Sequence, residues 1–234
     1  MKKGILKAVS GLLMSAMLFS SCQKDPQNDG ELSYRFTTTG QVASLGANVG
    51  TSGAVVAKGT NGSIEWTTGT LNVAKIEFEA VKDNVKSEIE YKNLFGLDVL
   101  KSGVLAGSVT VPTGTYQQVE FKMMLEPSNT SAPLVLNGIY TELSGTKIPV
   151  EVIFNEAAEL KVQGQQIVVK GDKFVADVTV ELNNLVKNCL TSDFGATVRN
   201  ANNKIIISNT INVNVYNKLK AALPTVAKVQ ITRL

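Results

Sequence analysis

The stretch that decides the fold class is Phe174-Val175-Ala176-Asp177-Val178-Thr179-Val180-Glu181-Leu182. Apolar residues occupy every second position of this stretch, and most of the residues between them are polar. Side chains two positions apart lie on the same face of a β-strand, so one face would lie on a core and the other mostly in water. The stretch therefore predicts a half-buried strand.

The same alternation recurs over residues 71–80, 119–125 and 148–154. Further short strands are expected at 87–91, 97–100, 134–140 and 160–169. The pairs Asn61-Gly62, Asn137-Gly138 and Gly171-Asp172 are typical of tight turns. Many short strands with such turns predict an all-β fold, an antiparallel β-sandwich with Greek-key-like connections.

Helix is expected in only one or two short pieces. Residues 183–190 predict a short helix after the 174–182 strand. Residues 211–223 fit a strand at their start and a helix at their end, where Pro224 would stop it. Residues 40–63 are rich in glycine and show little periodicity, so we expect loop or edge structure there.

The first 21 residues are typical of a secretory signal peptide that directs export by the Sec pathway. Three lysines form a positive start, and residues 12–19 form an apolar run that is too short to span a bilayer. Ser20-Ser21-Cys22 then resembles the lipobox of bacterial lipoproteins, although Phe19 stands where leucine is usual. The resemblance implies that Cys22 becomes the lipidated first residue; the alternative is an ordinary secretory signal in which Cys22 is incidental.

The rest of the chain predicts two further parts. Residues 22–32 are polar and would form a flexible stalk after the lipidated Cys22. Residues 33–234 would form a single β-sandwich domain, with residues 191–234 as a basic C-terminal extension packed on it. We expect a protein held by its lipid anchor at the outer membrane or the cell surface.

Composition excludes several classes of chemistry. The chain has no histidine and two cysteines, so catalytic arrangements that need histidine and imidazole zinc sites are excluded. Cys189 lies in a largely apolar stretch, and we interpret it as a buried, inert thiol rather than a reactive one. No linear motif for a metal or a nucleotide is present, so no cofactor and no metal are expected, while calcium held by scattered loop oxygens stays open.

Charge is divided unevenly along the chain. The formal net charge is +3, but Lys2, Lys3 and Lys7 belong to the signal peptide. Residues 194–234 carry six basic and no acidic residues, whereas residues 22–193 carry 14 basic and 20 acidic residues. The basic segment is either a docking patch for anionic polysaccharide or lipid headgroups, or a segment that neutralises the rest of the domain. The balance of charge favours neutralisation, and nucleic acid is not an expected partner of an exported protein.

Four pieces of the chain carry a family resemblance: Val73–Ala80, Gly96-Leu97-Asp98-Val99-Leu100, the run from Val111-Pro112-Thr113-Gly114-Thr115-Tyr116 to Leu125, and Phe174–Val186. Together, over roughly residues 64–187, they resemble uncharacterised Bacteroidetes lipoprotein domains, a β-sandwich domain of unknown function. The Asp-Ala-Pro signature usual near the first strand of such domains is absent. The resemblance implies a location and a fold, and it carries no catalytic residue across.

Carboxylates and aromatic residues are the remaining candidates for a site. A glycan hydrolase would need two carboxylates beside a sugar cleft. The candidates are Asp98, Asp172, Asp177, Glu181 and the pair Glu77 and Glu79, which are expected on solvated faces of strands. Trp66 is either an exposed platform for a glycan or an edge-strand or core aromatic, and Tyr91 is a second candidate for exposure.

These observations predict a non-enzymatic binding or adhesion module at the cell surface, with a glycan or protein ligand that the sequence does not identify. The first alternative is a fimbrillin-like pilus subunit assembled by strand exchange, since Tyr34-Arg35-Phe36 lies in a short first strand that contains a protease-sensitive arginine. A carboxylate-dependent glycan hydrolase is the less favoured alternative. The oligomeric state stays open.

Overall fold

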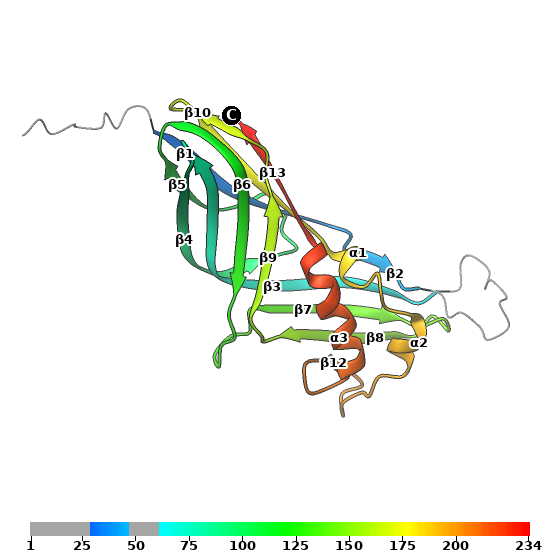
Figure 1. Cartoon of the computed structure of the whole chain (residues 1–234). Coiled ribbons are helices and arrows are strands. Elements are labelled where there is room, and N and C mark those ends of the chain that lie inside the picture. The colour runs from blue at the N-terminus through cyan, green and yellow to red at the C-terminus, as the bar shows by residue number, and fades with distance from the viewer. Residues whose placement is uncertain (1–28, 47–60) are drawn as a thin grey trace, which may run out of the picture.

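The computed structural model describes residues 29–46 and 61–234, and its fold is all-β and sandwich-like, as predicted (Figure 1). The signal peptide and Cys22 lie outside the described residues. The strands are β1 (Gly30–Thr39), β2 (Val42–Ser44), β3 (Ser63–Lys82), β4 (Val85–Asp98), β5 (Val104–Val111), β6 (Gly114–Leu125), β7 (Leu134–Thr141), β8 (Lys147–Phe154), β9 (Ala158–Gln163), β10 (Ile167–Val169), β11 (Lys173–Glu181), β12 (Ile205–Ile207) and β13 (Ala227–Arg233). The helices are α1 (Leu182–Leu185), α2 (Thr191–Gly195) and α3 (Val213–Ala222), and a 3-10 turn, η2, follows at Leu223–Thr225.

Two sheets make up the fold. The smaller has the strand order β13-β11-β1-β5. The larger has the order β10-β6-β3-β7-β8-β12, with β2 and β4 also paired to β3, and β9 paired to β6. The pairs β1–β11 and β12–β8 are parallel, where antiparallel pairing was expected. The strands of each pair are far apart in the chain, so no tight hairpin dictates their relative direction.

The longest strand, β3, belongs to both halves of the larger sheet. Its first half pairs with β2 and β7, and its second half pairs with β4 and β6. The pairing shifts register between Trp66 and Thr68, Leu71 and Val73, and Glu79 and Val81. Such bulges increase the twist of a strand and bend it. In Figure 1, β3 accordingly runs along β7 and then turns upward beside β4 and β6.

The core lies between the sheets in one half of the molecule and beneath the helices in the other. Tyr34 of β1 meets Phe121 of β6 with 5.3 Å between ring centroids, which joins the two sheets. Tyr216 of α3 packs on Phe154 of β8, with 5.1 Å between ring centroids. The helices therefore cover the part of the larger sheet that the smaller sheet does not reach.

Three local predictions are wrong. The separate strand expected at 97–100 is absent, because β4 runs to Asp98 and Val99 and Leu100 lie in the turn that follows it. Residues 213–222 are helical throughout, so the strand expected at the start of 211–223 is absent; burial of Val215, Tyr216 and Leu219 on one helix face explains the difference. Asn137-Gly138 lies inside β7 and not in a turn. A Cβ on Gly138 would stand 2.5 Å from the Glu65 carbonyl oxygen, so glycine is required here for close approach between strands.

The described chain begins and ends at the same end of the molecule (Figure 1). The Thr113 N–H donates to Asp29 Oδ1 at 3.1 Å, and the Leu234 N–H donates to the Lys173 carbonyl at 2.8 Å. Strand β1 starts at Gly30, inside the segment 22–32 expected as stalk. None of the helices within 29–46 and 61–234 has the length and apolar character needed to cross a membrane.

Core packing predicts that truncating two different phenylalanines has very different effects on stability. Phe121 is fully buried, whereas Phe95 of β4 is 65% exposed. We expect Phe121→Ala to lower the free energy of unfolding by about 3–5 kcal/mol, because it leaves a cavity, and Phe95→Ala to change it by less than about 0.5 kcal/mol. Urea denaturation of the two purified variants measures both values, and equal losses would contradict this assignment of the core.

Candidate functional site

Trp66 lies in the core. It is only 2% exposed, and its ring packs over Gly138 of β7. The prediction that Trp66 contacts a glycan is therefore wrong, and the alternative interpretation as a core aromatic is confirmed. Tyr91 is half-buried, and its ring lies near the ring of Tyr34, with 6.2 Å between the centroids.

The candidate catalytic carboxylates are engaged in local bonds. Asp172 pairs with Arg233 at 2.5 Å, Asp177 with Arg35, and Glu181 with Lys228 at 2.6 Å. Asp98 accepts a hydrogen bond from the Leu100 N–H at 3.0 Å. Each of these carboxylates therefore forms a structural interaction with a neighbouring group.

Glu77 and Glu79 are buried, which corrects the prediction that they lie on a solvated face. They are 4% and 8% exposed. Lys75 pairs with Glu77, and Lys122 of β6 reaches Glu79 at 2.7 Å. Lysine stems from β3 and β6 thus lie over the carboxylates and shield them from water while keeping their charges paired.

Glu79 and Glu120 line a common hollow on this charged face. Lys122 and Lys86 lower the pKa of Glu79, and Lys161 lowers the pKa of Glu120. A glycosidase needs one carboxylic acid with a raised pKa to protonate the leaving group. Both carboxylates are ionised at neutral pH, so this pair lacks the required acid.

A group of three carboxylates, Glu77, Glu88 and Glu90, gathers where β3 and β4 pair, with ligand oxygens within 4.8 Å of one another. Lys75 pairs with Glu90 at 2.9 Å and Lys92 pairs with it at 2.8 Å. Lysines thus already offset the charge that would attract a cation, and we assign no metal to this group.

The basic segment 194–234 neutralises acidic residues elsewhere in the chain. Each of its six basic residues forms an ion pair, and all six acidic partners precede residue 194. The pairs are Arg199–Glu142, Lys204–Glu151, Lys218–Asp193, Lys220–Glu156, Lys228–Glu181 and Arg233–Asp172. The interpretation as an internal counter-charge is confirmed.

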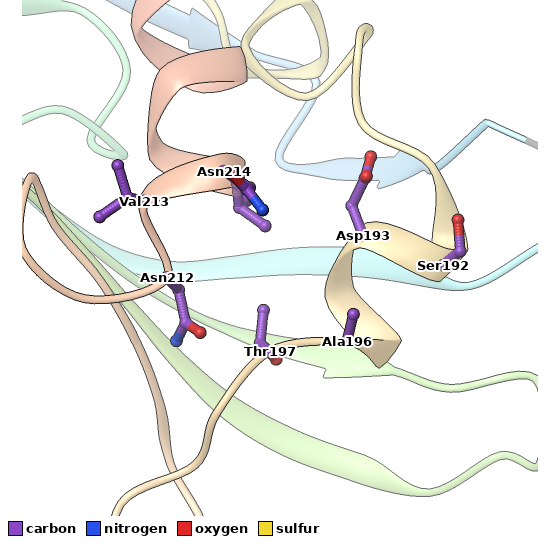
Figure 2. A pocket seen from close by; sticks show the side chains of 8 residues that line it. Ser192, Asp193, Ala196, Thr197, Asn212, Val213 and Asn214 are labelled. Carbon is purple, nitrogen blue, oxygen red and sulfur yellow. The ribbon is translucent and has the colours of Figure 1, made fainter.

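A hollow of about 230 Å³ lies between α2 and the start of α3. Figure 2 shows Asp193 on one side of it and Asn212 on the other. The Asp193 carboxylate accepts from the Leu190 N–H and pairs with Lys218 Nζ, both at 2.6 Å. The Asn212 side chain bonds the Val198 N–H at 2.8 Å and the Val198 carbonyl at 2.9 Å. These polar groups join the helices to the segment between them, so we interpret this hollow as a structural joint.

A third hollow, of about 410 Å³, lies beside Phe95 at the end of β4. Strand β4 has one extra residue opposite β3 here, because the flanking pairs are Leu71–Leu97 and Val73–Leu94. Leu94 and Leu97 both point into the core, and the two residues between them, Phe95 and Gly96, are exposed. Gly96 adopts a φ of 69°, which glycine accommodates without strain. The bulge thus turns Phe95 outward, as bulges beside functional sites often do.

The opposite wall of the Phe95 hollow is the loop after β6, residues 126–131. Asn72 of β3 connects the two walls: its Oδ1 accepts from the Gly96 N–H and its Nδ2 donates to the Ala132 carbonyl, both at 2.8 Å. Asn155 holds the loop from its other side, bonding the Ser128 N–H at 2.9 Å and the Ser128 carbonyl at 3.1 Å. The walls are therefore fixed relative to each other.

Phe95 is not among the residues predicted from the sequence. A signal was present, since Leu94-Phe95-Gly96-Leu97 breaks the period of two and places glycine within a strand, which is a mark of a bulge.

The lysine-covered carboxylates predict acid sensitivity. Lys92 and Lys75 lower the pKa of Glu90 to about 2, and the pKa values of Glu79 and Glu120 are also lowered. In the unfolded chain these groups titrate near about 4.3, so their stabilisation is present above that pH and is lost as the pH falls toward 2. We expect a constant Tm from pH 7 to 5 and a falling Tm below pH 4.5.

Thermal unfolding followed by circular dichroism measures this profile. The Glu79→Gln variant should show a shallower fall, because one of the ion-paired carboxylates has been removed. A Tm that stays unchanged down to pH 2.5 would contradict the role given to these pairs.

Comparison with known proteins gives little further information. No protein-family model matches the chain, and no curated protein matches it. Among solved structures, the chain is similar to a proposed cell adhesion protein from Bacteroides eggerthii, at 10% identity and a TM-score of 0.24. The match covers 88% of this chain and 55% of that protein, so the chain spans about half of its length. A likeness of this size carries no argument about function, and the resemblance to Bacteroidetes lipoprotein domains stays a prediction.

Proposed function

We propose that the mature protein is a lipid-anchored, non-enzymatic binding module at the outer membrane or cell surface. The observation that carries this proposal is the placement of the Phe95 hollow relative to the point where the chain enters the fold. Strand β6 begins at Gly114, next to the Thr113–Asp29 hydrogen bond, and ends at Leu125, where the loop of the hollow starts. A strand of this length spans roughly 40 Å. A stalk ending at Asp29 would thus present the hollow away from the membrane.

The state of the carboxylates supports a non-enzymatic role. Glu79 and Glu120 line one hollow, but neighbouring lysines lower the pKa of both. Asp172, Asp177 and Glu181 are each paired with a cation. A glycan hydrolase remains the less favoured alternative, because a general acid with a raised pKa is its central requirement.

The first test is of binding as such. The purified full chain is screened against glycans, peptides and host-matrix proteins. Binding to a member of any of these groups supports a recognition module. Absence of binding to all of them would count heavily against it.

A pilus subunit is the second candidate, and the position of β1 favours it. β1 is the first strand of the described chain, and it is hydrogen-bonded along both edges, to β11 and to β5. If β1 left, it would expose a groove that a strand of another copy could fill. Cross-linking on intact cells tests this candidate: a ladder of polymers supports strand exchange, and monomer alone excludes it.

Lipid anchoring predicts a specific effect of Cys22→Ser. Without the acylated thiol the protein should leave the membrane fraction and no longer incorporate labelled palmitate, because two or more acyl chains are what fix such a protein stably to a bilayer. The matched control is Cys189→Ser, since Cys189 is buried and burial raises its pKa to about 12. A Cys22→Ser protein that still carries label in the membrane fraction would contradict the anchor.

A further inference from the structure

We propose that the Phe95 hollow binds a neutral oligosaccharide. This inference rests on the proposed function as a binding module and names the ligand class and the site. The argument combines an exposed aromatic ring, a wall of hydroxyl groups, the charge of the lining and the rigidity of both walls.

The Phe95 ring is held in water by the local backbone. Phe95 is 65% exposed, although both leucines that flank the bulge are buried. Exposing so large an apolar ring costs hydrophobic free energy, of the order of 1.5–3 kcal/mol for a phenylalanine side chain. A flat apolar ring beside a polar hollow matches the C–H face of a pyranose ring, which is the apolar part of a sugar.

The facing wall of the hollow offers hydroxyl groups. Ser128, Thr130 and Ser131 line it, and the Ser128 and Thr130 hydroxyls lie 3.0 Å apart and share one hydrogen bond. A hydroxyl provides one donor and two acceptor positions. Ser128 Oγ also accepts from the Thr130 N–H at 3.2 Å and the Ser131 N–H at 3.3 Å, so its capacity is filled, whereas the Thr130 hydroxyl keeps its donor and one acceptor position. A hydroxyl with this remaining capacity can donate to and accept from the hydroxyls of a sugar.

The charge of the lining disfavours anionic glycans. Glu126 is the ionisable residue among those that line the hollow, and no lysine or arginine lies among them. A carboxylate would repel a uronate or a sulfate, and the lining supplies no cation to compensate. This arrangement favours a neutral saccharide.

The site needs little ordering on binding. Asn72 connects the bulge to the loop, and Asn155 fixes Ser128 from the β8–β9 connection. Affinity gained from a few contacts is then not lost in ordering the loop. The volume of about 410 Å³ lies within the range of small-ligand sites.

The experiment measures binding of the purified full chain to an array of neutral and anionic oligosaccharides, followed by titration calorimetry with the best neutral binder. Phe95→Ala and Phe95→Leu should each weaken binding about tenfold or more, because the flat ring is lost in both. Phe95→Trp should retain it. The matched control is Leu105→Ala, which truncates an equally exposed apolar side chain on β5, 67% exposed, and should leave affinity unchanged.

Each result decides the proposal. Neutral oligosaccharide binding that is lost in Phe95→Ala and kept in Phe95→Trp supports it. Binding to none of the neutral glycans, preference for anionic ones, or equal affinity of Phe95→Ala and wild type would overturn it. Because the assay is done in solution, its failure is distinct from failure of membrane anchoring. A protein or peptide ligand found in the wider screen would preserve the binding module while removing this ligand class.

Discussion

The structure depends on one uninterrupted strand that serves two packing partners. β3 extends for 20 residues, and it supplies hydrogen bonds to β2 and β7 in its first half and to β4 and β6 in its second. A straight strand could not lie beneath the helices and also face the smaller sheet. Register shifts in the pairing of β3 with its neighbours accompany this bend, and the shift opposite Asn72, where β4 carries the extra residue, is also the one beside Phe95. The fold and the candidate site thus share one backbone irregularity.

Charged side chains of the described residues pair largely with one another, both over the buried carboxylates of β3 and at the surface. Buried Glu77 and Glu79 are covered by lysines of their own and neighbouring strands, and the basic residues after Asp193 pair with acids from earlier in the chain. Exposed ion pairs of this kind contribute little each, between about 0 and 1 kcal/mol. Their main effect is on placement, because each one links the C-terminal segment to a particular strand or loop.

Patterns within one segment were predictable, and contacts between segments were not. The alternation at 174–182 predicted β11, which covers Lys173–Glu181, and the charge division predicted the C-terminal ion pairs. Asn137-Gly138 looked like a turn because the sequence does not show that Trp66 lies over that glycine. Burial of Glu79 depends on Lys122, which lies 43 positions later. Phe95 could have been suspected from its glycine neighbour, but its hollow requires a loop from another part of the chain.

The parallel pairing of β1 with β11 has a consequence for how the protein acquires its structure. Arg35 finds its partner Asp177 142 positions further along the chain, and β11 in turn pairs with the last strand, β13. The smaller sheet therefore cannot close until almost the whole polypeptide is available. Folds dominated by such distant pairings form slowly, over about milliseconds to seconds. If the chain is exported as we propose, this delay would leave it unfolded while it passes through a translocation pore.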